Sequence, residues 1–489
     1  MNHVLEISNL AFFYYYLACN LIYLVMLIIA LRTSAVHHKG LLSVNPNWVS
    51  KSPLAPPITL IVPAHDEEKS ICVSVSNLLD LDYPELEFVV VNDGSKDRTL
   101  QLLQSKFQLR PVRAVYVPEI KSAPVRAIYR STLDPRLLVL DKDSGGSKAD
   151  AVNAGLNAAT SPYVCVVDAD SVLEQDALLR IMVPVLADPK YVVSVGGIVR
   201  VVNGSEIESG RVTKVRLPHK NIEVLQVVEY LRAFLVGREA WAWKNMLMII
   251  SGAFGVFRTD LVRAVGGYNA GAIGEDFELV VRMHRHLLDK KQKYRIAFVP
   301  DPVCWTEAPS DLRSLGRQRC RWQKGLLDGL WRHKDMLFRP KYGRTGCFAL
   351  PYMWIFELFA PLVEVTGMTT IVIAAILGVL SRQFFLEFLL FGYAFATAIS
   401  IGAVLQEELT YKRYNRWQDV ARLIGYCFLE HFPYRQIQML WRLQGIWQYL
   451  KGDTEWKPLK RQGLGAADTS LSHAKTYAAA AGPGQASKS

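Results

Sequence analysis

The feature that most constrains this chain is an apolar run at residues 11–31, in which Asn20 is the one strongly polar side chain. About 20 apolar residues in an α-helix are enough to cross the hydrocarbon core of a bilayer. A secretory signal peptide would have a shorter apolar part and would end at a small-residue cleavage site. We therefore expect a membrane-spanning helix. The basic residues that follow it, including Arg32 and Lys39, place the next segment on the cytoplasmic side.

A second apolar block begins near Gly346 and predicts a helical hairpin with spans at 362–380 and 384–405. Because basic residues follow the hairpin, both of its ends are expected on the cytoplasmic side; these residues are Lys412, Arg413 and Arg416. The segment 348–360 is expected to lie in the membrane interface. Glu357 and Glu364 either lie near the headgroups or line a polar path through the membrane.

The next segment, 417–451, is amphipathic and aromatic, but it carries Arg422, Glu430, His431, Arg435 and Arg442. A full crossing would place the basic residues Lys457, Lys460 and Arg461 outside, so we expect an interfacial or re-entrant helix. Residues 477–489 are rich in Ala, Gly and Ser and predict disorder. The expected parts are an N-terminal span and linker at 1–50, an α/β domain at 51–345, the interfacial helix and hairpin at 346–410, amphipathic helices at 411–465 and a disordered tail at 466–489.

The composition favours a folded protein that is partly embedded in lipid. Of 489 residues, 51% are apolar and 21% are charged, and the mean hydropathy is slightly positive. The net charge of +11 suits an anionic lipid surface or phosphate-bearing substrates, and no nucleic-acid-binding module is legible. None of the seven cysteines forms a CxxC pair, which argues against a zinc site and for a reduced, cytosolic domain.

The middle of the chain alternates between strand and helix patterns. Apolar strand patterns occur at 58–62, 88–91, 137–140 and 163–167, and helical patterns separate them at 67–80, 97–107 and 147–159. This alternation predicts an α/β domain with a mostly parallel sheet and helices on both faces. In such sheets, ligands bind beyond the carboxyl ends of the strands.

Acidic residues collect at those predicted strand ends. Asp66 and Glu67 follow the first strand, and Asp93 follows the second, where it is either a turn residue or a contact to a nucleotide. Asp168 and Asp170 follow a later strand directly. Two carboxylates in this arrangement can reach one divalent ion, Mg²⁺ or Mn²⁺, which prefers oxygen ligands shared with substrate phosphates.

Three further segments carry candidate chemistry. Lys148 follows two glycines at a helix start, where it either binds a phosphate or is simply solvated. Glu275 and Asp276 open an amphipathic helix, so they are either caps or, for one of them, a general base. The basic, aromatic stretch at 317–325 either binds a diphosphate or contacts lipid headgroups.

Taken together, these motifs resemble the processive members of glycosyltransferase family 2, which include synthases of hyaluronan, chitin, cellulose and poly-N-acetylglucosamine. The family pattern is an aspartate, a DxD pair, an ED pair and Q(Q/R)xRW. The order holds here at Asp93, Asp168–Asp170, Glu275–Asp276 and Gln318–Trp322, over roughly residues 58–410. The third motif reads GED here and not the TED of cellulose synthases. This resemblance implies a GT-A domain combined with transmembrane helices.

The resemblance also implies a role for each residue. Asp66, Glu67, Asp93, Lys148 and Asp168 would bind a UDP-sugar, and Asp170 with Asp168 would hold Mg²⁺ or Mn²⁺. Asp276 would be the catalytic base, next to Glu275. The residues that would bind the diphosphate and the acceptor are Glu307, Gln318, Arg319, Arg321 and Trp322.

The implied function is a membrane-bound, inverting enzyme that builds a β-linked polysaccharide, with UDP-N-acetylglucosamine favoured as donor. Its catalytic domain would face the cytoplasm at a plasma (inner) membrane. Its partners would be the growing glycan, the bilayer and possible export proteins. Two alternatives stay open: an enzyme that transfers a single sugar to a lipid or glycan, and a non-catalytic membrane scaffold.

Overall fold

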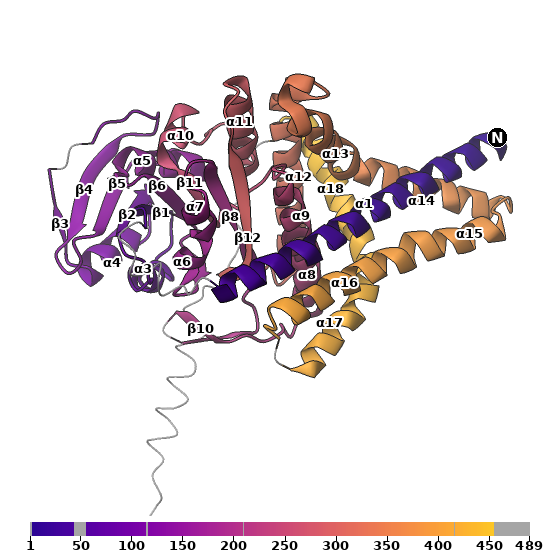
Figure 1. The fold of residues 1–489 in the computed structure, drawn as a ribbon, viewed down its shortest axis with the longest axis horizontal. Coiled ribbons are helices and arrows are strands. Elements are labelled where there is room, and N and C mark those ends of the chain that lie inside the picture. Colours follow the sequence, from indigo (N-terminus) through magenta and orange to yellow (C-terminus); the bar gives the residue numbers. More distant parts are fainter. Residues whose placement is uncertain (1, 44–54, 114–115, 209, 415, 454–489) are drawn as a thin grey trace, which may run out of the picture.

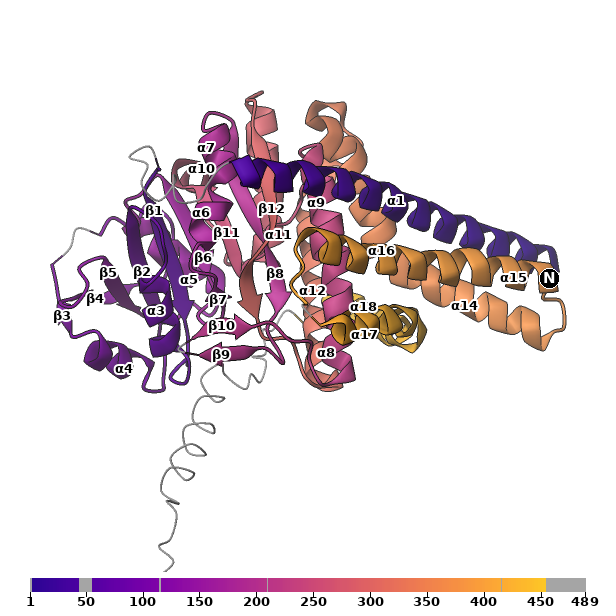
Figure 2. The same ribbon diagram turned by 60° about the horizontal axis from the view of Figure 1, so that its bottom comes forward.

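The computed structural model describes residues 2–43, 55–113, 116–208, 210–414 and 416–453. An α/β domain lies at one end of the molecule and an arm of long helices at the other (Figures 1 and 2). The predicted disordered tail at 466–489 and the basic residues Lys457, Lys460 and Arg461 lie outside the described residues, as does most of the predicted linker.

A mostly parallel sheet of ten strands forms the centre of the α/β domain, in the order β3-β4-β5-β2-β1-β6-β11-β8-β12-β7. Strands β5, β2, β1 and β6 are parallel neighbours, whereas β11 runs antiparallel between β6 and β8. A separate two-stranded sheet pairs β9 with β10. The strands are β1 Ile58–Ala64, β2 Leu86–Asp93, β3 Leu109–Pro111, β4 Val125–Ser131, β5 Leu137–Lys142, β6 Tyr163–Val167, β7 Val172–Leu173, β8 Val192–Val201, β9 Glu206–Glu208, β10 Arg211–Lys214, β11 Phe254–Arg258 and β12 Arg295–Thr306.

Helices cover both faces of this sheet, so the central strands are apolar along their whole length, as buried parallel strands are. One face packs against residues of α3, α4, α6 and α7, and the other against residues of α5, α10 and α11. These helices are α3 Ile71–Leu79, α4 Thr99–Lys106, α5 Lys148–Ala158, α6 Ala177–Ile181, α7 Val183–Ala187, α10 Thr259–Ala264 and α11 Glu275–Asp289. The predicted fold class is confirmed.

The predicted helix at 67–80 begins later than expected, at Ile71. Glu67 lies in a turn before the helix, where its carbonyl accepts from the amide of Ser70 and its carboxylate from the Ser70 hydroxyl at 2.8 Å. Similarly, α4 begins at Thr99, later than expected; Asp97 lies in the turn before it and accepts a hydrogen bond from the amide of Thr99 at 2.9 Å. Both acidic residues therefore act at helix starts and not inside helices.

The helical arm contains the predicted membrane segments. Helices at Ile7–Val36 and Arg382–Thr410 are long and apolar enough to cross a membrane, and the bent pair Thr345–Leu358 and Ala360–Ile376 could form a third span. The bend of 43° falls where a change from an interfacial segment to a span was expected. The elements are α1 Asn2–Ser43, η4 Thr345–Ala349, α13 Leu350–Tyr352, η5 Met353–Leu358, α14 Ala360–Ile376, α15 Arg382–Phe388, η6 Leu389–Ala394 and α16 Phe395–Thr410.

A layer of helices separates the sheet from the arm (Figure 2). Among these helices, α12 packs against both α11 and α18. No helix of the 417–450 segment qualifies as a candidate span within the described part of the chain. The layer consists of α8 Asn221–Tyr230, η1 Leu231–Gly237, α9 Arg238–Trp243, α12 Leu312–Arg332, α17 Trp417–Leu429, η7 Glu430–Tyr434 and α18 Arg435–Leu450, and the short turns η2 Lys334–Met336 and η3 Pro340–Tyr342 follow α12.

Two glycines let α11 begin directly against α12. A Cβ atom on Gly325 would lie 3.0 Å from the Cα of Gly274, the residue just before α11. One turn further along α12, a Cβ on Gly329 would lie 2.5 Å from the ring of Phe277. The absence of these side chains therefore sets how close the start of α11 lies to the middle of α12.

Replacing Gly325 with alanine should destabilise the protein even though alanine is the better helix former. The added methyl group meets backbone, which cannot rotate away, and overpacking of this kind costs about 1–3 kcal/mol. The matched control is Gly425→Ala in α17, because nothing lies within 4 Å of a Cβ at that helical position. Thermal unfolding in detergent should show a lower Tm for Gly325→Ala and an unchanged or higher Tm for Gly425→Ala. Equal Tm values would contradict the close-contact argument.

Candidate active site

The carboxyl ends of β1, β2, β5 and β6 lie side by side, because these four strands are parallel neighbours. They bring together the loops that carry Asp66, Asp93, Lys148 and Asp168. The exposed carboxylate of Asp66 accepts hydrogen bonds from the amides of Lys96, at 2.7 Å, and Asp97, at 3.3 Å. It therefore ties the loop after β1 to the loop after β2. Glu67 supports the same junction, since its amide donates to the Thr99 hydroxyl at 2.9 Å.

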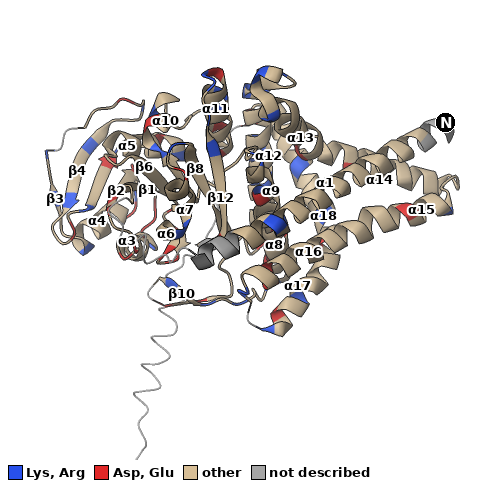
Figure 3. Ribbon diagram, viewed as in Figure 1, with Lys and Arg blue, Asp and Glu red and all other residues tan. Residues whose placement is uncertain are grey.

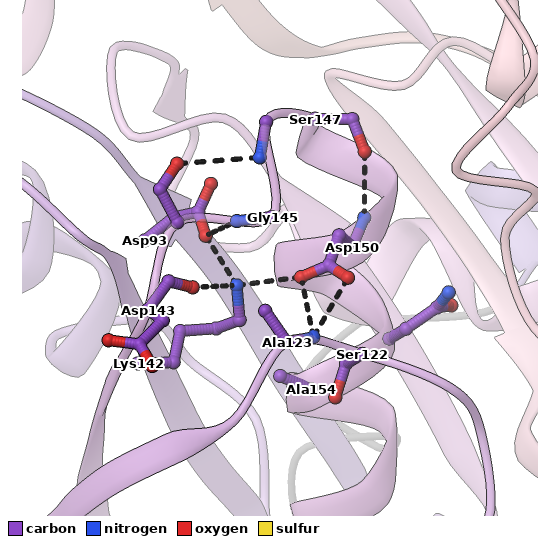
Figure 4. Close-up of polar contacts among 12 residues, drawn as sticks. Asp93, Ser122, Ala123, Lys142, Asp143, Gly145, Ser147, Asp150 and Ala154 are labelled. Atoms are coloured by element: carbon purple, nitrogen blue, oxygen red, sulfur yellow. Dashed lines mark hydrogen bonds and ion pairs between the residues drawn. The ribbon is translucent and has the colours of Figure 1, made fainter.

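Asp93 belongs to a buried charge cluster (Figure 4). Its carboxylate pairs with the ammonium of Lys142 and accepts from the amide of Gly145 at 3.1 Å. The same ammonium lies 2.6 Å from Asp150 Oδ2, and no part of the Lys142 side chain is exposed. Asp150 in turn accepts from the amide of Ala123 at 3.0 Å. One lysine thus holds the glycine loop of residues 144–146 between the ends of β2 and β5.

A second lysine connects the DxD segment to the start of α11. The ammonium of Lys148 pairs with Asp168 and donates to the carbonyl of Gly252 at 2.7 Å. The amide of Gly252 donates to Asp276 Oδ2 at 3.2 Å. Lys148, Asp168 and Asp276 therefore form one continuous hydrogen-bonded set, although they come from three distant parts of the sequence.

Asp170 is buried, with 6% of its surface exposed, in the turn just after β6. Together with the half-buried Asp168 it supplies carboxylate oxygens, the donor type that Mg²⁺ and Mn²⁺ prefer. Within the described part of the chain, no group of three or more His, Cys, Asp and Glu side chains is arranged to hold a metal ion. A divalent ion here would therefore have to complete its coordination with oxygens of a substrate or of water.

Glu275 and Asp276 occupy the first two positions of α11, where the helix dipole favours negative charge. Burial raises the pKa of Glu275, and the neighbouring Asp276 carboxylate raises it further; the cations of Lys148 and Arg321 oppose both effects. Glu275 therefore interacts electrostatically both with Lys148 at the start of α5 and with Arg321 of α12.

The QRCRW residues of α12 divide between two faces of the helix. Gln318 and Arg321 line a cavity of about 370 Å³ between α12 and α18, together with Arg317, Lys324 and Trp441. The Gln318 Oε1 atom is buried and has no hydrogen-bond partner among the described residues. Arg321 likewise makes no ion pair with any described residue. This face presents donors and an acceptor to a ligand.

Arg319 does not line this cavity. It is 3% exposed, pairs with Glu229 at 2.8 Å and stacks 4.1 Å from the centre of the Trp322 ring. Trp322 keeps 38% of its surface exposed and lies beside Tyr230 and Phe234. The geometry thus makes Arg319 a support for Trp322. Glu307 is half-buried in the loop between β12 and α12.

Sequence patterns did not single out Arg238, the first residue of α9. It is buried, its guanidinium stacks 4.1 Å from the ring centre of Phe234, and its Nη1 atom has no hydrogen-bond partner among the described residues. Burial lowers the pKa of Arg238 to about 10, and the Asp276 carboxylate opposes that shift. The signal that could have revealed it is that only three charged residues, Arg232, Arg238 and Glu239, interrupt the otherwise apolar segment 230–243. Lys142 and Asp150 were missed because both read as ordinary polar residues near a turn.

Comparison with known proteins shows the family of this chain. The family model described as "Glycosyltransferase like family 2" matches residues 56–325, more than half of the chain. The chain therefore belongs to glycosyltransferase family 2 and is a glycosyltransferase.

Its relatives include the poly-β-1,6-N-acetyl-D-glucosamine synthase of Staphylococcus epidermidis, 24% identical over 77% of this chain and 79% of the relative. The synthase of the same name from Staphylococcus aureus (strain COL) is 27% identical over 62% of this chain and 61% of the relative. Among solved structures, the mannosyltransferase PcManGT of Pyrobaculum calidifontis, in complex with GDP-Man and Mn²⁺, is 21% identical with a TM-score of 0.48, covering 83% of this chain and 99% of that one.

Lys142→Met should destabilise the fold strongly, because it leaves the buried carboxylates of Asp93 and Asp150 without their shared cation. Breaking a buried pair on one side costs about 3–5 kcal/mol. The double variant Lys142→Met/Asp93→Asn should recover part of the loss, and the exposed Lys106→Met in α4 is the matched control. Thermal unfolding of the purified variants measures the effect. A Tm for Lys142→Met equal to that of the control would contradict the role of this cluster.

Proposed function

We propose that the protein is a membrane-bound, inverting and processive glycosyltransferase that polymerises N-acetylglucosamine from UDP-N-acetylglucosamine into a β-linked polysaccharide. The observation that carries this proposal is the contact between the ED pair and the QRCRW helix. Gly274 and Gly325 touch backbone to backbone, while Lys148 and Gly252 connect Asp276 to the DxD segment. Donor, base and acceptor motifs thus meet at one place.

The donor would bind across the carboxyl ends of β1, β2 and β6. In this proposal the loop ordered by Asp66, Glu67 and Asp93 receives the nucleotide, and Lys148 offers its charge to the diphosphate. Asp170 and Asp168 would hold Mg²⁺ or Mn²⁺, and the buried carboxylate at the strand end fits such an ion. When bound, the ion neutralises charge on the leaving diphosphate.

Asp276 would remove the proton from the acceptor hydroxyl. The hydroxyl oxygen then forms a bond to the anomeric carbon as the bond from that carbon to the diphosphate oxygen breaks, and UDP leaves with the bonding electrons. Attack from the face opposite UDP inverts the configuration. The guanidinium of Arg321 lies on the cavity face of α12 and stabilises the departing diphosphate. The guanidinium of Arg238 interacts electrostatically with the Asp276 carboxylate and would help to position it.

The acceptor end of the glycan would stack on Trp322, which has both an exposed face and a fixed position. Two charged contacts join the arm to α18 of the helical layer. Glu364 of α14 pairs with Arg435 at 2.5 Å, and Glu357 of η5 lies 3.7 Å from Arg442. Both glutamates, whose placement the sequence left open, are thus bound to arginines of α18. This supports a polar route for the product toward the arm, with export proteins as further partners.

The proposed location is a bacterial-type inner membrane with the α/β domain in the cytoplasm. The supporting observation is that α1, α14 and α16 lie together in the arm and the α/β domain lies at one end of it (Figure 1). The basic residues after α16 lie at the end of the arm nearer the α/β domain, as the positive-inside rule requires.

Asp276→Asn should abolish turnover while leaving donor binding largely intact. Loss of a general base lowers the rate by about 10²–10⁴-fold, and asparagine keeps the size of the side chain that Gly252 contacts. UDP release reports turnover, and calorimetric titration with UDP and Mn²⁺ reports binding. Asp260→Asn is the matched control, because Asp260 is an exposed aspartate at the start of α10. Normal polymer synthesis by Asp276→Asn would contradict the assignment of the base.

A further inference from the structure

A second and larger cavity lies apart from the candidate active site. Its volume is about 890 Å³, and its walls come from residues 172–175, from residues 211–216 at β10, and from residues 410–413 and Arg416 at and after the end of α16. None of the motif residues assigned above to the donor, base or acceptor lines it. The residues that line this cavity therefore determine which ligand it can bind.

The lining of this cavity is strongly basic. Seven of its residues are Lys or Arg, and two, Glu174 and Asp301, are acidic. Figure 3 shows basic residues on β10 and on the loop between α16 and α17. Such an excess of positive charge around a concave surface attracts anions.

Part of this charge is balanced inside the protein, and part is not. Glu174 pairs with Arg180 and lies 3.2 Å from Arg413, and Glu206 pairs with Lys214 and Arg216. By contrast, Lys412 and Arg416 are exposed and make no ion pair with any residue that the structure describes. Their charges are therefore available to a ligand.

A crossing by the candidate span Arg382–Thr410 would place the cavity at the depth of lipid headgroups. The candidate span Arg382–Thr410 has 29 residues, which at about 1.5 Å per residue gives roughly 43 Å. A bilayer with its headgroup regions is about 40–45 Å thick. Thr410 itself lines the cavity, so the cavity opens where the span leaves the membrane.

Part of the lining is apolar. Val172 and Trp305 are buried there in one cluster, with Val212 and Val215 packed against them. A free phosphate would gain nothing from this surface, whereas a lipid would bring a glycerol backbone and the first carbons of its chains beside its phosphate.

We propose that this cavity binds the phosphate-bearing headgroup of an anionic phospholipid, with Lys412 and Arg416 as its cationic contacts. The segment 172–175 that forms one wall follows Asp170 by two positions. Trp305 fixes this segment by donating from Nε1 to Glu174 Oε1 at 3.3 Å. A bound lipid would therefore contact the same loop that carries the DxD pair.

The test is a binding measurement that does not depend on enzyme activity. The full-length protein in a neutral detergent is titrated with dioctanoyl phosphatidylglycerol, dioctanoyl phosphatidylcholine and glycerol 3-phosphate, and the change in intrinsic tryptophan fluorescence is followed. The proposal predicts saturable binding of phosphatidylglycerol and none of phosphatidylcholine. Equal affinity for glycerol 3-phosphate would overturn the lipid assignment in favour of a free phosphate site.

The variant Lys412→Asn/Arg416→Gln locates the site. Asparagine is chosen because Lys412 has a φ of 50°, a left-handed conformation that asparagine tolerates. Each basic residue near an anionic surface contributes to the free energy of binding, and the loss of two such residues should weaken binding about 30-fold. Lys106→Asn/Arg110→Gln, which changes two exposed residues at the end of α4 and in the edge strand β3, is the matched control. Unchanged affinity in the first variant, with a Tm equal to that of the control, would overturn the proposal. Because turnover is not measured, failure here leaves the proposed function untouched.

Discussion

The ammonium of Lys148 holds together parts of the chain that the sequence keeps far apart, and the rest of the candidate site depends on it. It contacts Asp168, just after β6, and the carbonyl of Gly252, just before β11. The amide of that glycine then fixes Asp276. Four carboxylates, including Asp170 and Glu275, belong to this region, and without a cation their mutual repulsion would separate the loops. The same positive charge is what a diphosphate would meet on arrival.

The candidate site is also tied to the candidate membrane spans. Glu239, which follows Arg238, accepts hydrogen bonds from Thr33 at 2.8 Å and Ser34 at 2.7 Å, both on α1, and from Gln406 on α16 at 3.2 Å. Arg200 of β8 forms a buried ion pair with Glu407 of the same span. Buried pairs of this kind are costly to break on one side. The candidate spans therefore help to set the position of α9, and with it that of Arg238.

Much of this could be predicted from the sequence. Apolar runs bounded by turn residues predicted β1, β2, β5 and β6, and the acidic residues after them predicted where the candidate site lies, because both signals are local. The antiparallel β11 and the cluster around Lys142 were not predicted, since they depend on which strands become neighbours. Arg319 is an example of what the sequence does not predict. It belongs to the QRCRW motif, but its packing against Glu229 and Trp322 becomes visible only in the structure.

The measurement that tests the central claim most directly is the product formed from each donor. The wild-type protein in nanodiscs is incubated with Mn²⁺ and, separately, with each common UDP-sugar, and both UDP release and product size are measured. The account predicts UDP release from UDP-N-acetylglucosamine together with a product of high mass. Release of UDP with only a short product, or no release from UDP-N-acetylglucosamine, would contradict it.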